Sequence, residues 1–283
     1  MIAVDWGTSS FRAYRLDAQG AVLEARSADK GIMAVPPGPE VLEEVIGAWL
    51  DDAPIVMSGM VGSRQGWVEV PYVECPAGLD DLSRSLKKVR WGARAAWIVP
   101  GVSCRNAVPD VMRGEEVQVL GAAQEGLICL PGTHSKWVEV RDGRIQRFST
   151  SMTGEVYAVL KQHSILGRMM EESGPQPDAF REGVHRSGDE GGVLHHLFGV
   201  RTRGLMGELA PAASAAYLSG LLIGHELRMF CQESFFLLGE PVLVSLYQQA
   251  AEQLGMKGGA LDPRAGTRAL YRLGVMLAAK EES

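Results

Sequence analysis

The sequence predicts an α/β fold of two domains, each a mixed sheet that opens with β-hairpins and is flanked by helices. Two observations carry this prediction. A strand, a Gly-Thr turn and a second strand occur twice, at Val4–Arg12 and at Leu130–Trp137. The chain has 283 residues, 46% of them hydrophobic, which is enough for two hydrophobic cores.

The repeat extends past both turns. Phe11–Leu16 turns at Asp17–Gly20 into a third strand. In the second copy, Lys136–Val140 turns at Arg141–Gly143 into a strand at Arg144–Phe148. Two hairpins of one design therefore begin two half-chains, and duplicated units indicate a shared fold and function.

The spacing of apolar residues predicts the other elements of the first half, in the order β-β-β-α-β-α-β. We place the domain boundary near Pro109–Arg113, which gives an N-terminal domain of residues 1–110 and a C-terminal domain of residues 111–283. After the opening hairpins we expect helices at Pro39–Asp52 and Leu79–Val89, and short buried strands at Pro54–Met57 and Ala95–Val99.

Helices and strands also alternate in the second half. The segment Glu171–Gly192 is polar and rich in Gly and Pro, so we expect a surface loop or an insertion that carries a helix. The other expected elements are helices at Gly114–Gln124, Glu155–Gln162, Pro211–Cys231, Val242–Leu254 and Asp262–Ala279, and strands at Leu127–Leu130 and Phe235–Leu238.

Composition argues against several classes of partner. Lys and Arg number 28 against 34 Asp and Glu, and no basic tract offers a surface for nucleic acid or an anionic membrane. The most apolar window, Ala212–Leu222, is shorter than the ~20 residues of a membrane span, and Met1–Val4 enters a strand without a signal-peptide pattern. Four scattered cysteines with no C-x-x-C pair suit a reducing cytoplasm.

The two Gly-Thr turns are candidate phosphate sites. Gly7, Thr8 and Ser9 in the first turn, and Gly132 and Thr133 in the second, present backbone N–H groups and small hydroxyls where no bulky side chain intrudes. Two such turns facing each other suit a triphosphate. The alternative for either turn alone is an ordinary hairpin connection.

Charged and polar residues flank these turns. Asp5 ends its strand before the first turn, where a carboxylate can hold Mg²⁺ through water; capping of the turn is the alternative. Arg12 and Lys136 can neutralise phosphate charge, and His134 and Ser135 can donate hydrogen bonds to phosphate. The alternative for Arg12 and Lys136 is the solvated face of a strand.

The loop Ser58–Trp67 places three glycines around one arginine and one amide. Arg64 offers a planar fork for a carboxylate, and Gln65 can both donate to and accept from sugar hydroxyls. Met60 and Trp67 complete this candidate substrate site, Trp67 as an aromatic wall. An ordinary Gly-rich loop with a structural arginine is the alternative.

The segment Asp110–Gln118 places carboxylates at the start of a helix. Glu116 fits there as a partner of the helix dipole. Transfer of a phosphate to a hydroxyl needs a base beside the phosphate path, and the rigid start of a helix makes Glu115 the candidate. Neither G-x-x-x-x-G-K-[ST] nor G-x-G-x-x-G occurs in the sequence, so neither a P-loop nor a dinucleotide fold is predicted.

The order of four motifs resembles that of the 2-dehydro-3-deoxygalactonokinases, compact relatives of the glycerol and xylulose kinases. The resemblance implies a two-domain actin-like ATPase fold, as in the sugar kinases and Hsp70-like proteins. The motifs are Asp5–Thr8, Gly59–Gln65, Gly114–Gly121 and Pro131–Lys136, and the match extends through Phe148–Glu155, His163–Leu166 and Tyr217–Gly224.

The resemblance also implies an activity. ATP, with Mg²⁺, is expected to donate its γ-phosphate to the 6-hydroxyl of 2-dehydro-3-deoxy-D-galactonate, giving a product for aldol cleavage. Glu115 matches the Asp base of larger sugar kinases; because Glu is one methylene longer, Asp110 is a contender. Arg64 and Gln65 match a polyol-binding Arg-Glu pair, and Gly239 stands where relatives have a Gly-Gly turn for adenosine.

Two alternatives stay open from the sequence: a kinase for another sugar or amino sugar on the same fold, and a nucleotide-dependent binding module such as a chaperone-like ATPase or a sugar-sensing repressor. We expect a sugar acid and ATP as partners, no nucleic acid, no membrane, and a cytoplasmic location. A homo-oligomer is compatible with the sequence, which does not define the oligomeric state.

Overall fold

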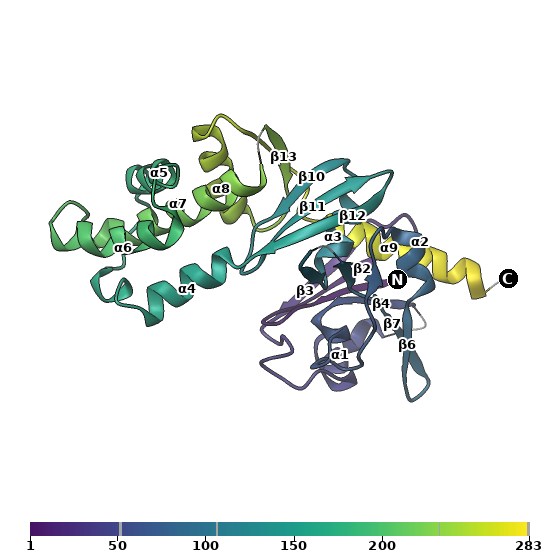
Figure 1. Cartoon of the computed structure of the whole chain (residues 1–283). Helices are drawn as coiled ribbons and strands as arrows, with labels where there is room; N and C mark the ends of the chain where they lie inside the picture. The colour runs from purple at the N-terminus through teal and green to yellow at the C-terminus, as the bar shows by residue number, and fades with distance from the viewer. Residues whose placement is uncertain (51–52, 106, 232, 282–283) are drawn as a thin grey trace. The chain divides into compact units, whose positions relative to one another are not determined.

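The computed structural model describes residues 1–50, 53–105, 107–231 and 233–281 (Figure 1). They form two compact units, each with its own hydrophobic core. Unit 1 comprises Met1–Gly126, Val138–Ser149 and Asp262–Ser283, and unit 2 comprises Leu127–Trp137 and Thr150–Leu261. The mixed α/β class is confirmed. The division into domains of residues 1–110 and 111–283 stays a prediction.

Unit 1 contains a six-stranded sheet. Its strands are β1 (Ile2–Trp6), β2 (Phe11–Leu16), β3 (Val22–Ala28), β4 (Ile55–Gly59), β6 (Lys87–Trp91) and β7 (Arg94–Ile98), in the order β3-β2-β1-β4-β7-β6. β1, β2 and β3 form an antiparallel meander, whereas β4 and β7 continue the sheet parallel to β1. The register places Asp5 between Arg12 on one side and Ser58 on the other.

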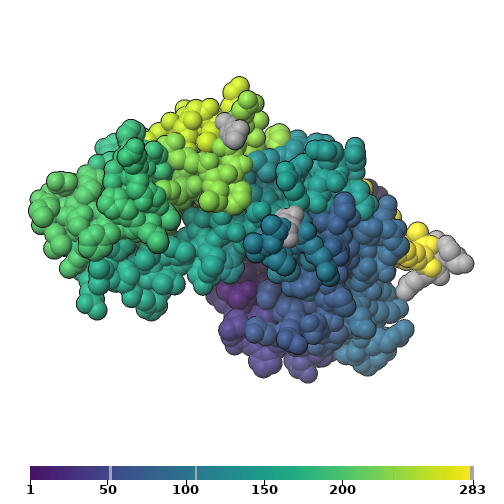
Figure 2. Space-filling view, viewed as in Figure 1, coloured from purple at the N-terminus to yellow at the C-terminus, as the bar shows by residue number. Residues whose placement is uncertain are grey.

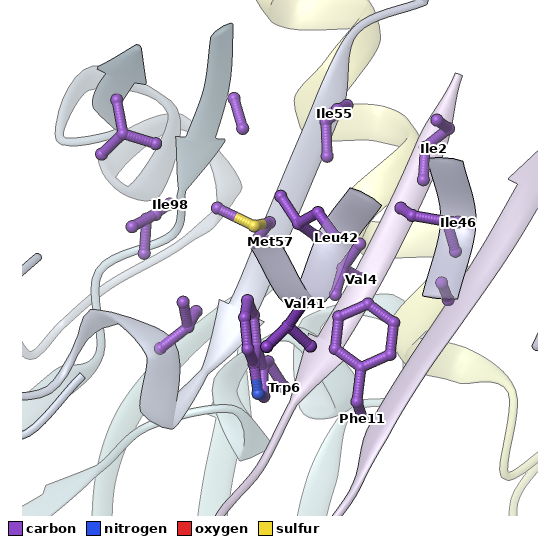
Figure 3. Packing of buried hydrophobic residues seen from close by; sticks show 14 of the residues in the cluster. Ile2, Val4, Trp6, Phe11, Val41, Leu42, Ile46, Ile55, Met57 and Ile98 are labelled. Atoms are coloured by element: carbon purple, nitrogen blue, oxygen red, sulfur yellow. The ribbon is translucent and has the colours of Figure 1, made fainter. Parts of the chain in front are cut away.

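An apolar layer packs this sheet against helix α1 (Pro39–Ile46). Figure 3 shows Leu42 of the helix among strand residues that include Met57 and Phe11. All three side chains are fully buried, and burying one such side chain contributes about 1.5–3 kcal/mol. This core fixes the strand that carries Asp5.

Three further helices belong to unit 1: α2 (Leu79–Arg84), α3 (Glu115–Ala122) and α9 (Ala265–Glu281). α3 and α9 touch along their backbones, because a Cβ on Gly121 would lie only 1.9 Å from the carbonyl oxygen of Ala265. A small sheet in the order β5-β8-β9 precedes α3; it consists of β5 (Val73–Glu74), β8 (Val102–Arg105) and β9 (Pro109–Met112). The helix that begins with Glu115 is therefore packed along its length.

A second sheet repeats the strand order of the first. Its strands are β10 (Gly126–Leu130), β11 (Ser135–Arg141), β12 (Arg144–Ser151), β13 (Ser234–Leu237) and β14 (Lys257–Ala260). The order β12-β11-β10-β13-β14 corresponds position by position to β3-β2-β1-β4-β7. β10, β13 and β14 run parallel to one another, as β1, β4 and β7 do in the first sheet. The duplicated hairpin in the sequence is thus part of a duplicated sheet, with a Gly-Thr turn after the first strand of each.

The helices of unit 2 are α4 (Thr153–His163), α5 (Pro177–Arg186), α6 (Gly192–Leu205), α7 (Pro211–Phe230) and α8 (Pro241–Gln253). α5 and α7 pack backbone to backbone, since a Cβ on Gly220 would lie 2.0 Å from the carbonyl oxygen of Phe180. α6 lies at the surface of this unit (Figure 2), and its Leu194 and Phe198 side chains are exposed.

Most predicted elements are confirmed, with one correction. The helix predicted across Leu79–Val89 ends at Arg84, and the chain then forms β6, which pairs with β7. The end of the helix predicted at Pro39–Asp52 falls on residues outside the described ranges. α6, β14 and the three strands of the small sheet were not predicted. Within the described ranges, every helix is too short or too polar to span a bilayer.

Candidate active site

The first Gly-Thr turn, Gly7–Ser10, is closed by a hydrogen bond of 2.9 Å from its first N–H to its last carbonyl. Its outer side is packed: the N–H of Met33 donates to the Thr8 carbonyl at 3.1 Å, and a Cβ on Gly31 would lie 2.2 Å from that oxygen. Thr8 and Ser9 are exposed, and within the described chain their N–H groups have no acceptor. The turn is rigid on one side and offers donors on the other, which suits a phosphate oxygen.

Asp5 and Arg12 lie side by side next to this turn. They are directly opposite in the β1–β2 pair, with Arg12 Nη1 3.9 Å from Asp5 Oδ2. Burial raises the pKa of Asp5; the Arg12 guanidinium opposes this shift, and the negative charge of Glu115 adds to it. Asp5, Arg12 and Glu115, predicted as the metal, phosphate and base residues, are therefore close enough for their charges to interact.

Two glycines make this meeting of residues sterically feasible. Gly59 ends β4 with φ +94° and Gly114 precedes α3 with φ +110°, conformations that side chains rarely adopt. A Cβ on Gly114 would lie 3.2 Å from the Gly59 Cα, and a Cβ on Gly59 would lie 3.4 Å from Asp5 Oδ1. Helix α3 can therefore start directly against the strand ends, which places Glu115 near Asp5.

The carboxylates of the helix start differ in environment. Glu115 accepts a hydrogen bond from the N–H of Arg113 at 3.0 Å. Glu116 is fully buried and accepts from the N–H of Gly114 at 2.6 Å; burial, and then the charge of Glu115, raise its pKa to about 8. Asp110 lies on β9, where it accepts from the N–H of its neighbour at 2.8 Å. Glu115 is the carboxylate of this segment whose charge acts on Asp5.

The predicted substrate loop folds back on itself. Trp67 donates its N–H to the Val61 carbonyl at 2.9 Å, and its ring packs edge-on against Trp91 with the ring centroids 5.6 Å apart. Arg64 and Gln65 are exposed, and Met60 and Trp67 are half-buried. The loop therefore holds its aromatic residue in place and leaves the planar fork and the amide accessible to a ligand.

Arg113, which the sequence did not single out, lies buried beside this segment. Its Nη2 donates to the Val70 carbonyl at 2.7 Å, and its guanidinium lies 4.4 Å from the centroid of the Tyr72 ring. Among the described residues, Arg113 Nε and Nη1, Ser63 Oγ and Glu116 Oε1 have no hydrogen-bond partner. Buried polar groups without a partner are few in folded proteins, and ordered water or a bound ligand can satisfy them.

The second Gly-Thr turn belongs to unit 2 and is braced by helix α4. The N–H of Glu155 donates to the Thr133 carbonyl at 3.0 Å, and His134 Nε2 bonds to the Glu155 carboxylate. A Cβ on Gly154 would lie 2.4 Å from the Gly132 carbonyl oxygen. Thr133 and His134 are exposed, so this turn too is packed on one side and accessible on the other.

The residues that follow this turn are buried. Ser135 is fully buried, and its hydroxyl lies 3.0 Å from the Tyr247 hydroxyl. Lys136 is 5% exposed and, as the next residue of β11, points to the opposite face of the sheet. The predicted phosphate contacts of both side chains stay predictions.

Gly239 lies two residues after β13, beyond the carboxyl end of that strand. A Cβ there would lie 3.5 Å from the Pro131 carbonyl oxygen, so Gly239 approaches the second turn. The next residue, Glu240, caps α8 by accepting hydrogen bonds from the N–H groups of Val242 and Leu243 at 3.0 and 3.1 Å.

A cavity of about 570 Å³ opens among the helices of unit 2. Helix α4, which begins on the second turn, contributes Tyr157 and Lys161 to its wall, and α8, which begins after Gly239, contributes Leu246 and Gln249. The remaining lining residues are Glu171, Glu172, Ser173, Gly174, Pro175, Gln176, Pro177, Phe180, Ala215, Ala216 and Ser219. Its size and mixed polarity suit a small organic ligand.

Comparisons with known proteins agree over nearly the whole chain. The model of the 2-keto-3-deoxy-galactonokinase family matches residues 5–273. The "Probable 2-dehydro-3-deoxygalactonokinase DgoK1" of Rhizobium meliloti (strain 1021) is 39% identical over 286 residues, 94% of each chain. The 2-dehydro-3-deoxygalactonokinase of Escherichia coli (strain K12) is 35% identical over 266 residues, 90% of each chain.

A solved structure gives the same answer at the level of the fold. A protein from Sinorhizobium meliloti, described as a candidate 2-dehydro-3-deoxygalactonokinase, matches with a TM-score of 0.88 at 35% identity over 98% of each chain. The resemblance and the actin-like fold predicted from the sequence are confirmed. The chain belongs to the 2-keto-3-deoxy-galactonokinase family.

Proposed function

We propose that this protein is an ATP-dependent 2-dehydro-3-deoxygalactonokinase that phosphorylates the 6-hydroxyl of 2-dehydro-3-deoxy-D-galactonate. Family membership supports the reaction class and the use of ATP. The observation that carries the proposal is the pair of equivalent Gly-Thr turns, each with exposed residues at the end of the first strand of a duplicated sheet. Phosphoryl transfer depends mainly on alignment and charge neutralisation, which such turns provide.

The phosphates of ATP are held by backbone donors and cations in this proposal. Thr8 and Ser9 donate one set of contacts, with Arg12 beside them, while Gly7 closes the turn with its own N–H and leaves room for the phosphate. The turn around Thr133 forms the other set, with His134 and Lys136 nearby. Arg12 is more than half exposed and is therefore free to move toward a phosphate oxygen.

A magnesium ion fits next to Asp5. This side chain is about one-third exposed, it is an oxygen donor of the kind Mg²⁺ prefers, and its pKa is raised by burial and by Glu115, so a cation there relieves unfavourable negative charge. When bound, Mg²⁺ would neutralise charge on the phosphates. Asp5 would hold the ion through water.

Glu115 is the base in this proposal. Its carboxylate accepts the proton of the 6-hydroxyl as the oxygen attacks the γ-phosphorus, and the bond from the Arg113 N–H keeps the side chain turned to one rotamer. Asp110 is the contender. Glu115 is favoured because it lies at the start of α3, within electrostatic range of Asp5.

The sugar acid binds at the loop that carries Arg64 and Gln65, with Met60 and Trp67 as its apolar wall. Arg64 is exposed, so its fork is accessible to the substrate carboxylate. The unsatisfied groups around Arg113 lie beside this loop and are suited to ordered water or to substrate hydroxyls.

The adenosine half of ATP extends toward the cavity of unit 2. Tyr157 follows the start of α4 by four residues, about 6 Å along the helix axis, and Gly239 lies close to Pro131, directly before the second turn. We place the ribose near Gly239 and the base against Tyr157.

The use of ATP supports a location in the cytoplasm. A homo-oligomer stays an open proposal.

A coupled assay of ATP consumption over a panel of 2-keto-3-deoxy sugar acids and neutral sugars tests the function. We expect turnover with 2-dehydro-3-deoxy-D-galactonate and little ATP hydrolysis without an acceptor. Equal hydrolysis with no acceptor would contradict the kinase and favour a nucleotide-dependent binding module. Faster turnover of a neutral sugar or an amino sugar would contradict the proposed substrate.

A further inference from the structure

Glu226 is a buried carboxylate on helix α7, and it is 5% exposed. Its Oε1 accepts a hydrogen bond from Trp137 Nε1 at 2.7 Å. Its Oε2 accepts one from the Tyr247 hydroxyl at 2.7 Å and a second from the Thr153 hydroxyl. Donors from β11, α4 and α8 therefore converge on one side chain.

Ser135 extends this network in a defined direction. A tyrosine hydroxyl has one proton, and Tyr247 donates it to Glu226, so the 3.0 Å bond between Ser135 and Tyr247 must be donated by the serine. Burial raises the pKa of Glu226, while the hydrogen bonds from its partners oppose the shift. Hydrogen bonds to an ionised carboxylate are stronger than neutral ones, and a buried network of this kind specifies one geometry.

Three residues of this network lie on the two elements that adjoin the second Gly-Thr turn. Ser135 and Trp137 are two residues apart on the strand that leaves the turn, so their side chains point to the same face of the sheet. Thr153 is the first residue of α4, and the next residue packs directly on the turn backbone. Glu226 thus fixes both the strand that leaves the turn and the helix that braces it.

The chemistry of the site calls for a carboxylate. Three donors approach two oxygens, and an ionised Glu is an acceptor at both of them, whereas Gln would replace one oxygen with an NH₂ group facing donors. A neutral apolar residue would leave the indole N–H and the hydroxyls buried without acceptors. The site therefore requires a side chain that accepts hydrogen bonds at both ends of its polar group, and an apolar side chain of the same size would not replace it.

We propose that Glu226 is a positioning residue for the ATP phosphates, which holds the turn Gly132–His134 in its binding geometry without touching the nucleotide. This inference rests on the proposed kinase function. It predicts a selective effect, because the hydrogen bonds of the network reach the strand that leaves the second turn and the helix that braces it, and none of them involves the substrate loop.

Three variants test the proposal. Glu226→Gln removes the charge at constant size, and Tyr247→Phe and Thr153→Val each delete one donor while keeping the side-chain shape. The matched control is Ser187→Ala. This variant deletes a buried hydroxyl that accepts a hydrogen bond at 3.0 Å from Arg228, which lies on the same helix as Glu226. Within the described part of the chain, these two residues have no hydrogen bond to the turn.

We expect Glu226→Gln to lower kcat/KM for MgATP by about 10- to 100-fold, through a lower kcat and a higher KM. A small misplacement of a binding group has effects of this size. The KM for the sugar acid should stay within about twofold. Tyr247→Phe and Thr153→Val should show smaller losses, again in kcat and the KM for MgATP and not in the KM for the sugar acid. Combining either with Glu226→Gln should lower activity by less than the sum of the two separate free-energy effects, because the residues act in one network. Ser187→Ala should leave both KM values unchanged.

Calorimetric titration with ADP separates this inference from the proposed function, because it needs no sugar acid. Weaker ADP binding by Glu226→Gln supports the proposal even if wild-type protein phosphorylates no sugar acid, an outcome that would overturn the proposed function alone. If the Glu226 variant does not fold, the Tyr247 and Thr153 variants decide. Melting temperatures that fall while the KM for MgATP and the ADP affinity stay at wild-type values would show that the network is structural only and would overturn the proposal.

Discussion

Gly114 lies against Gly59: a Cβ on Gly114 would be 3.2 Å from the Gly59 Cα. This contact sets the start of α3, and with it Glu115, against the end of β4, the strand that pairs with the Asp5 strand β1. The first prediction concerns this contact. Gly114→Ala places a side chain at φ +110°, which costs about 1–3 kcal/mol of backbone strain, and the tight contact adds to it.

Chemical denaturation should show this loss of stability for Gly114→Ala, and kcat should fall further because Glu115 is displaced. Gly143→Ala is the control, since that glycine also has a positive φ, +66°, but a Cβ there would meet nothing within 4 Å. Equal stability and equal kcat for the two alanine variants would show that the contact between the glycines has no role in placing Glu115.

The second prediction concerns Arg64. Arg64→Lys keeps the charge but removes the planar fork, and loss of a charge-assisted hydrogen bond costs about 1.5–3 kcal/mol. Steady-state kinetics should show this as a higher KM for the sugar acid, with the KM for ATP little changed. Arg94→Lys, at an exposed arginine paired with Glu43 at 3.2 Å, should change neither. An unaltered sugar-acid KM in Arg64→Lys would reassign Arg64 to a structural role.

The third prediction is a pH dependence of stability. Burial and the charge of Glu115 raise the pKa of Glu116 to about 8, so the folded protein binds the Glu116 proton more tightly than the unfolded chain. The resulting stabilisation is complete below the unfolded pKa of 4.5 and is lost as the pH rises through about 8. The free energy of unfolding should therefore fall with rising pH, by at most about 1.4 kcal/mol per pH unit from this group.

Denaturant titrations between pH 5 and pH 9, roughly the window that separates the two pKa values, measure this slope. Glu116→Gln should flatten it, whereas Glu43→Gln, at a surface carboxylate, should not. A slope that persists unchanged in Glu116→Gln would assign the pH dependence to another group.

The fourth prediction tests the adenosine site. Tyr157→Ala should raise the KM for ATP, because stacking of a base on an aromatic ring contributes about 1–3 kcal/mol. The sugar-acid KM should not change. Phe198→Ala removes an exposed aromatic ring outside the cavity and serves as the control. Identical ATP kinetics in the two variants would place the base elsewhere.

Local patterns predicted much of the fold, because turns and amphipathic helices depend on neighbouring residues. The hairpins at both Gly-Thr turns and helices α4, α7 and α8 were predicted within a few residues. β6 was missed because the helix was predicted to run on from Leu79 to Val89, whereas Lys87–Trp91 pairs with β7 and forms a strand. β5 and β14 pair with strands that are distant in sequence, and β8 and β9 are short neighbouring strands that pair with each other.

The candidate site shows the same limit. Asp5, Arg12 and Glu115 could be proposed from motifs, because each stands next to a recognisable turn or helix start. Arg113 and Glu226 could not, since their importance comes from burial and from partners on other elements, such as Val70 for Arg113 and Trp137 for Glu226. The one sequence signal for Arg113 was its place directly before the Gly-Glu-Glu motif.

The central claim is that Glu115 accepts the proton of the 6-hydroxyl as the phosphate is transferred. A carboxylate in this role contributes roughly 10²–10⁴-fold to the rate, and Glu115→Gln keeps size and hydrogen bonding but removes the basicity. The decisive measurement is the single-turnover rate of sugar-acid phosphorylation in Glu115→Gln and Asp110→Asn, with the phosphate position read from its ³¹P coupling to the C6 protons. We predict a loss of that order in Glu115→Gln with near wild-type substrate affinities, and a much smaller loss in Asp110→Asn. Abolished turnover in a folded Asp110→Asn protein, with Glu115→Gln still active, would contradict the account.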